Sequence, residues 1–132
     1  MPRRGEIRAL AREHHGALIL ARDIARLPDA ASMDVLAAMN ARIARYWTHD
    51  MAAHFRREEA LLLRLPGVLP HDKVLALLDD HRLLAALCVR AGANDLRLAS
   101  MRSFGERLAA HVRFEERECF DALQDALEAA SE

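Results

Sequence analysis

The sequence predicts an all-α protein, an antiparallel four-helix bundle with up-down-up-down connections, and three observations support this fold class. Ala, Leu, Arg and Glu dominate the 132 residues, and all four are strong helix formers. Only 5% of the residues are aromatic and β-branched residues are scarce, so the material of a β-sheet is missing. Three loop-forming segments leave four long stretches, each with apolar residues at helical spacing.

The three loop-forming segments are rich in residues that end helices or form turns. The first, residues 27–32, contains a proline that stops a helix and ends at Ser32, which can cap the next one. The second, residues 65–72, holds two prolines and a glycine, with Asp72 as a possible N-cap. The third is residues 91–95. Because these loops are short, successive helices are expected to be antiparallel.

Each of the four stretches repeats apolar side chains every three or four residues, as a helix with one buried face does. The four apolar stripes are Ile7, Leu10, Ala17, Ala21 and Ile24; Val35, Met39, Ile43, Trp47, Met51, Leu61 and Leu65; Val74, Leu77, Leu78, Leu84 and Cys88; and Met101, Phe104, Leu108, Leu123 and Leu127. Arg, Asp and Glu fill the opposite faces. We expect a single domain over residues 1–132 with no internal linker.

Charge and hydropathy exclude several classes of function. The chain carries 19 Lys and Arg against 20 Asp and Glu, whereas a nucleic-acid-binding domain usually has a clear basic excess. No apolar run approaches the roughly 20 residues of a membrane span, and the N-terminus lacks the apolar core of a signal peptide. Two cysteines make no disulfide framework. We therefore expect a cytoplasmic protein that binds neither nucleic acid nor membrane.

Histidine is the unusual component, with seven residues in a short chain. Four of the seven fall on the apolar stripes, one on each predicted helix: His14, His54, His81 and His111. Glu58 and Glu115 follow two of these histidines by four residues, which places each carboxylate one turn further along the same helix face. The remaining histidines are expected to lie in solvent, with His15 as the alternative to its neighbour: His15, His49 and His71.

These six inward polar residues favour a metal site only when they are taken together. A single inward His is more often a core residue with satisfied hydrogen bonds, and one His-x-x-x-Glu pair is common by chance. A buried carboxylate, however, costs several kcal/mol unless it is paired or binds a metal. Imidazole suits Fe, Zn, Cu and Ni, and carboxylate adds a preference for harder ions. Six donors exceed the four of a tetrahedral zinc site and suit two ions that share carboxylates.

The residues around these donors resemble a known family. Residues 54–59 (HFRREE) and 111–116 (HVRFEE) are similar to the two HxxxEE motifs of hemerythrin-like, HHE cation-binding domains. Residues 12–15 (REHH) resemble the EH motif of the family's first helix, and residues 79–83 (DDHRL) resemble the histidine motif of its third helix. The resemblance covers nearly the whole chain, with the motifs in the family's order.

The resemblance implies a non-heme di-iron centre with two Fe ions bridged by carboxylates and an oxo or hydroxo group, Mn or Zn being alternative metals. It makes the four inward histidines terminal ligands and makes Glu58 and Glu115 the bridging ligands. The ligand it implies is O2 or another small diatomic or peroxide molecule, bound for sensing, storage or detoxification. A peroxidase- or catalase-like enzyme and a purely structural metal such as zinc are the alternatives. Since no dedicated acid or base stands out, a non-enzymatic role is preferred.

The chain departs from the oxygen-carrying hemerythrins at two positions. These proteins have two histidines one turn apart on the third helix, but Leu77 and Ala85 stand four residues from His81. Their fourth-helix carboxylate is an Asp five residues after the His, which corresponds to Glu116; Glu115 is preferred because it repeats the spacing of the other pair. The missing histidine favours bacterial HHE proteins with sensing, stress or iron-handling roles over reversible O2 carriage.

Several neighbours of the six residues have expected supporting roles. Glu59 and Glu116 are expected to hydrogen-bond to the ligands or to face solvent. Asp80 is a candidate partner for a ligand imidazole, because a metal-bound His usually donates its other N–H to a carboxylate or carbonyl. Tyr46 and Trp47, about two turns before His54, are expected to pack in the core rather than to relay electrons.

Overall fold

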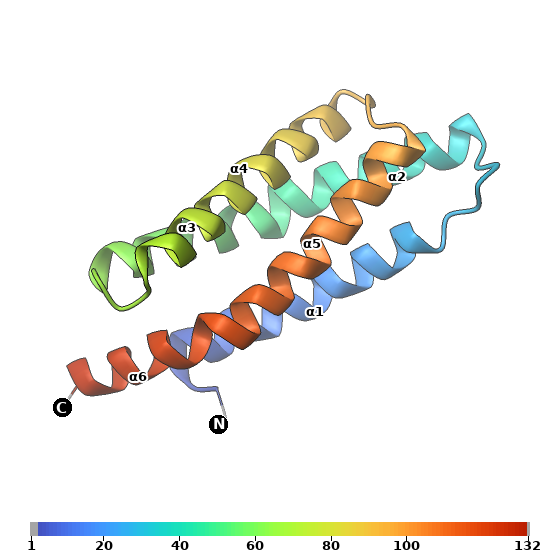
Figure 1. Cartoon of the computed structure of the whole chain (residues 1–132). Coiled ribbons are helices and arrows are strands. Elements are labelled where there is room, and N and C mark those ends of the chain that lie inside the picture. The colour runs from blue at the N-terminus through green and yellow to red at the C-terminus, as the bar shows by residue number, and fades with distance from the viewer. Residues whose placement is uncertain (1–2, 132) are drawn as a thin grey trace.

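The computed structural model describes residues 3–131, and all of its regular secondary structure over that range is helical (Figure 1). The elements in chain order are α1 (Gly5–Ala25), α2 (Met33–Tyr46), the π-helical segment η1 (Trp47–Met51), α3 (Ala52–Arg64), α4 (His71–Gly92), α5 (Leu98–Glu118) and α6 (Phe120–Ala130). The predicted all-α class is confirmed. No helix in the described range is long and apolar enough to cross a membrane.

The helices pack antiparallel along most of their length. The elements α2, η1 and α3 follow one another without interruption, and only Cys119 separates α5 from α6. Four helical stretches result, and each runs opposite to the one before it (Figure 1). The most extensive contacts join α1 to α5 and α2 to α4. The loops fall at residues 26–32, 65–70 and 93–97, close to the predicted breaks.

One predicted helix cap is confirmed and the other is wrong. The side-chain oxygen of Ser32 accepts a hydrogen bond from the backbone N–H of Val35 at 3.2 Å, which caps α2. Asp72 does not cap α4, because the helix already begins at His71, directly after Pro70. Asp72 lies instead in the first turn, where a carboxylate interacts favourably with the positive end of the helix dipole.

The π-helical segment changes which residues of the second stretch share a face. In a continuous α-helix Trp47, seven residues before His54, would lie above it. A π turn closes its hydrogen bonds from i to i+5 and so accommodates one extra residue. Because of this extra residue, the eight positions from Tyr46 to His54 correspond to seven in a regular α-helix, so Tyr46 lies on the same face as His54. Trp47 lies instead on the side that faces α4. Both Tyr46 and Trp47 are partly buried and pack against the larger apolar cluster, which confirms their expected packing role. The predicted stripe is wrong at Val35, which is 40% exposed in the first turn of α2.

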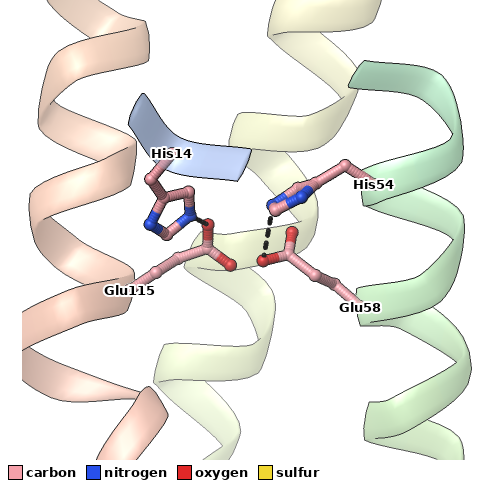
Figure 2. A group of neighbouring side chains, drawn as sticks. All are labelled: His14, His54, Glu58 and Glu115. Carbon is pink, nitrogen blue, oxygen red and sulfur yellow. Dashed lines mark hydrogen bonds and ion pairs between the residues drawn. The ribbon is translucent and has the colours of Figure 1, made fainter. Parts of the chain in front are cut away.

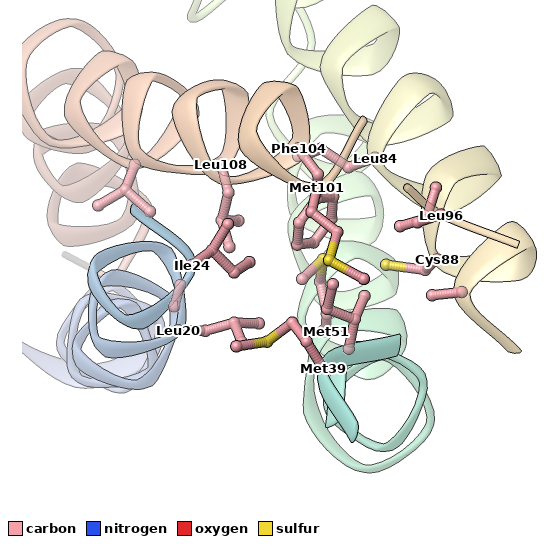
Figure 3. Packing of buried hydrophobic residues seen from close by; sticks show 14 of the residues in the cluster. Leu20, Ile24, Met39, Met51, Leu84, Cys88, Leu96, Met101, Phe104 and Leu108 are labelled. Carbon is pink, nitrogen blue, oxygen red and sulfur yellow. The ribbon is translucent and has the colours of Figure 1, made fainter. Parts of the chain in front are cut away.

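The buried apolar side chains form two clusters. The larger cluster, shown in Figure 3, includes Leu20, Ile24, Leu84, Met101, Phe104 and Leu108. The smaller cluster consists of Ile7, Leu10, Leu61, Leu69, Leu77, Cys119, Phe120 and Leu123. In α1 and α4 the inward histidine falls between a member of the smaller cluster and a member of the larger one. In α3 and α5 the inward residues lie next to members of the larger cluster, and members of the smaller cluster follow them along the chain. A polar layer thus divides the core.

Candidate metal centre

The polar layer consists of the six predicted site residues, and all of them are buried. They come from α1, α3, α4 and α5: His14, His54, Glu58, His81, His111 and Glu115. Their ligand atoms form two groups that share both carboxylates, and within each group the atoms lie within 4.8 Å of one another. The first group is His14, His54, Glu58 and Glu115, shown in Figure 2; the second is Glu58, His81, His111 and Glu115.

Each glutamate faces one histidine of its own helix and one of another helix. Nε2 of His54 lies 3.2 Å from Glu58, four residues further along α3. The same carboxylate accepts a hydrogen bond from Nε2 of His81 at 3.0 Å, or donates to it when protonated. Glu115 repeats this arrangement, since Nε2 of His111 lies at 3.1 Å and Nε2 of His14 at 3.0 Å. All four histidines therefore direct Nε2 towards the two shared carboxylates.

A second set of four carboxylates holds the outer nitrogens of the same histidines. Each acid is next in sequence to a site residue of its own helix but bonds to a histidine of another helix. The four contacts to Nδ1 are Glu13 to His54 (2.8 Å), Glu59 to His81 (2.7 Å), Asp80 to His111 (3.0 Å) and Glu116 to His14 (2.8 Å). The contacts run from α1 to α3, α4, α5 and back to α1, so they close a ring around the polar layer.

The antiparallel packing explains why this ring closes. A residue adjacent to an inward side chain points about 100° away from it, towards a neighbouring helix. In α1 and α4 the acid precedes the inward residue, and in the oppositely directed α3 and α5 it follows. Seen from one end of the molecule, successive residues rotate clockwise in helices of one direction and counterclockwise in the oppositely directed helices. All four acids therefore point the same way around the molecule. Each therefore meets the next helix in turn.

The ring fixes the tautomer of each imidazole. A carboxylate at Nδ1 accepts a hydrogen bond from the N–H there, so in a neutral ring Nε2 is the nitrogen that keeps a lone pair. Aromatic stacking holds two of the ring planes, since Phe55 lies on His81 with centroids 3.8 Å apart and Phe120 lies on His14 at 5.2 Å. The inner nitrogens are thus presented to the centre in a defined orientation.

Arginines at the surface pair with three of the four ring acids. Arg57 contacts Glu13, Arg107 lies 3.0 Å from Asp80, and Arg3 lies 3.4 Å from Glu116. No arginine of the described residues pairs with Glu59, whose side chain is 45% exposed. Arg57 and Arg107 are about half exposed, so their pairs orient the acids more than they stabilise the fold, whereas the side chain of Arg3 is 19% exposed.

The centre holds buried polar atoms that the protein itself does not satisfy. Oε2 of Glu58, Oε2 of Glu115 and Nε2 of His111 have no well-aligned hydrogen bond within the described structure. Orphaned buried acceptors are rare in folded proteins, because each one loses the solvation it had in water. The donor set fits a cation, since first-row metal ions bind imidazole nitrogen and carboxylate oxygen at about 2.0–2.2 Å. Two donors on opposite sides of one ion then lie little more than 4 Å apart, close to the observed spacing.

The two carboxyls differ in charge state when no metal neutralises them. Burial, together with the charge of Glu115, raises the pKa of Glu58 well above its usual range. Burial also opposes the charge on Glu115, but the neighbouring carboxyl of Glu58 and the imidazoles of His111 and His14 outweigh it and hold the pKa of Glu115 well below its usual range. A proton on Glu58 therefore neutralises one of two carboxylates that would otherwise repel each other.

The histidines differ in the same way. Burial lowers the pKa of His54 and of His81. Burial also acts on His111, but the carboxylates of Asp80 and Glu115 outweigh it and raise the pKa to about 9. The pKa of His14 is raised too, because Glu115 and Glu116 outweigh the effect of burial. Without a metal, the carboxylates around His14 and His111 thus favour the charged form of these two imidazoles, whereas burial disfavours it in His54 and His81.

A small cavity adjoins the first group of donors. It has a volume of about 10 Å³, the size that one water molecule needs. His14, His54, His111, Glu13 and Glu115 form its polar wall, and the other wall is formed by Ala17, Tyr46, Met51, Phe55, Leu108 and Val112. Neither Glu58 nor His81 lines it. Space for a small molecule therefore lies on one side of the centre.

The structure separates the alternatives that the sequence leaves open. His14 belongs to the buried group and His15 is exposed, as are His49 and His71, which confirms the expected exposure of these three. Glu115 belongs to both donor groups, whereas Glu116 bonds to the outer nitrogen of His14. Asp80 fills its expected supporting role.

Glu13 is the supporting residue that the sequence reasoning missed. From the sequence, Glu13 stands out only as part of the motif at residues 12–15, but in the structure it bonds to His54 and Arg57. A signal for it is present in the sequence, because an acid stands next to an inward residue on all four helices: Glu13, Glu59, Asp80 and Glu116. That pattern becomes informative once the helices are taken as antiparallel.

Comparisons with known proteins do not assign the site. No protein family, no curated protein and no solved structure gives a significant match to this chain. What the site does must therefore be inferred from the geometry and chemistry of its own residues.

Proposed function

We propose that this protein is a di-iron protein of hemerythrin-like type, an up-down-up-down four-helix bundle that binds O2 or a related small ligand. The observation that carries the proposal is the pair of donor groups that share Glu58 and Glu115. One ion would be held by His14 and His54, a second by His81 and His111, with both glutamates bridging them. The similarity of residues 54–59 and 111–116 to the family's HxxxEE motifs supports the same assignment.

The charges of the site support two divalent ions better than one. Two carboxylates and four neutral imidazoles surround the centre, and the four ring acids keep the imidazoles oriented with Nε2 inward. A single tetrahedral ion would use four of the six donors and leave the inward nitrogens of two buried histidines without a metal. The mixture of carboxylate and imidazole donors favours iron, with manganese or zinc as alternatives.

The small cavity supports a ligand-binding role. Iron held by these donors would supply the affinity for a small molecule such as O2. The protein's own part is to admit one small molecule beside His14 and His54, between apolar side chains that exclude bulk water. Sensing, storage or detoxification of an oxidant would fit this arrangement better than a purely structural metal.

Metal analysis of the purified chain, with a matched pair of variants, tests the proposal. We expect about two iron ions per chain after anaerobic loading with ferrous salt, because two donor groups are present. His14→Ala should lose iron, since it removes a donor of the first group. His15→Ala makes the same chemical change at an adjacent exposed residue and should retain iron.

Three results would contradict the proposal. One zinc ion per chain and no optical absorption on loading with iron would favour a structural site. Loss of iron from His15→Ala but not from His14→Ala would show that the ligands are misassigned. Steady peroxide consumption by the iron-loaded protein would favour the enzyme alternative over a ligand-binding role.

A further inference from the structure

Tyr46 lies in the wall of the small cavity beside the metal centre. The cavity is otherwise lined by apolar side chains and by residues of the site and its ring, so Tyr46 contributes its only phenol group. The ring of Tyr46 packs against the larger apolar cluster, and Gly16 of α1 faces it closely enough that a Cβ there would lie 3.7 Å from Cε2. Tyr46 is also the only tyrosine of the chain.

The π-helical segment is what brings Tyr46 to this position. Eight residues separate Tyr46 from His54, which in an unbroken α-helix corresponds to about 800° and places the two side chains roughly 80° apart. The extra residue in η1 reduces the effective separation to seven, and the two residues share a face. Trp47, the next residue, lines a different cleft between α3 and α4. Single π turns within α-helices occur often at functional sites.

The hydroxyl of Tyr46 is an available hydrogen-bond donor. Tyr46 is half-buried in the cavity wall, and no hydrogen bond joins its hydroxyl to another described residue. Burial and the nearby carboxylates of Asp50 and Glu13 raise the pKa of Tyr46, so the phenol stays protonated. Among the other polar groups of the cavity wall, Glu13 bonds to His54 and Arg57, and the three histidines and Glu115 belong to the donor groups of the centre.

We propose that the Tyr46 hydroxyl donates a hydrogen bond to the small ligand that occupies this cavity, and so sets the ligand's residence time. The inference rests on the proposed function. It names the feature that the ligand must have, an acceptor atom directed away from the metal centre. A diatomic molecule such as O2 or nitric oxide satisfies this requirement and matches the size of the cavity.

Nitric oxide bound to the ferrous-loaded full chain is the probe for this role. Tyr46→Phe removes one oxygen and retains the packed ring, so the fold should be unchanged. We expect nitric oxide to dissociate about fivefold faster from this variant, the effect of losing one hydrogen bond. The N–O stretching frequency should shift, and in the native chain the ultraviolet resonance Raman bands of the single tyrosine should change when the gas binds.

Trp47→Phe is the matched control, because it changes the adjacent aromatic residue, which lines the other cleft. It should leave the dissociation rate and the N–O frequency at their native values. Equal rates and frequencies in native chain and Tyr46→Phe would overturn the role of Tyr46, and so would equal effects of the two substitutions. If the native chain retains no iron, the proposed function itself falls and this inference falls with it; retained iron separates the two failures.

Discussion

The polar layer and the larger apolar cluster are built from the same helix faces, yet they are stabilised differently. In the apolar cluster Leu84, Met101 and Phe104 are fully buried, and packing alone satisfies them (Figure 3). In the polar layer Glu58 and Glu115 are buried almost as deeply, but each keeps an oxygen without a hydrogen bond. Equal burial therefore has opposite consequences: the apolar cluster stabilises the fold by itself, while the polar layer requires protons or a metal.

The largest expected effect tests the apolar cluster. Phe104→Ala should lower the free energy of unfolding by about 4 kcal/mol, because it removes a fully buried ring and leaves a cavity. The loss should be the same with and without iron, since Phe104 belongs to neither donor group. Denaturant unfolding of both forms measures it. A loss confined to the iron-loaded form would mean that the two regions are not independent.

The next effect tests the polar layer. Glu58→Gln should abolish the stabilisation by iron, which is about 3 kcal/mol when free iron is at 100 times its Kd. The same substitution should change the metal-free protein by less than about 1 kcal/mol, because an amide resembles the protonated carboxyl that the raised pKa of Glu58 favours. Thermal unfolding with iron and with chelator compares the two. A large loss in the metal-free form would show that Glu58 stabilises the core without metal.

A smaller effect is expected for the ring acids. Glu13→Gln should weaken iron binding by about 10- to 100-fold, the usual cost of removing a carboxylate that orients a ligand imidazole. Glu6→Gln on the same helix is the control, because Glu6 pairs with Arg64 at the surface and contacts no site histidine. Competition with a chelator of known affinity measures both variants. Equal weakening by the two substitutions would contradict an orienting role for the ring.

The smallest effect concerns protons that compete with the metal. In the metal-free protein the raised pKa of about 9 keeps His111 protonated at neutral pH, whereas a ligand imidazole must be neutral. Iron binding below pH 9 should therefore release this proton, and affinity should fall about tenfold for each pH unit of acidification per proton released. Titration with iron in weakly buffered solution measures the release. Affinity that is constant between pH 6 and 8 would exclude the competition.

Much of the fold and of the site could be predicted from the sequence, because both depend on local periodicity. The spacing of four between His54 and Glu58, and between His111 and Glu115, places each pair on one helix face whatever the tertiary context. The apolar stripes indicated the buried faces for the same reason. The packing of Tyr46 and Trp47 against the core was predicted, but not that Tyr46 lies on the face of His54, because the π turn that causes this leaves no reliable mark in the sequence.

Residue spacing alone defines the helices, their inward faces and the six polar residues that interrupt those faces, since a regular helix converts spacing directly into direction. Which of these residues contact one another depends on how the helices pack. This packing forms two donor groups with shared carboxylates, closes the ring of outer acids and leaves a cavity on one side of the centre. The physical reason is that contacts between helices depend on their direction, neighbours and local register. No single helix carries that information.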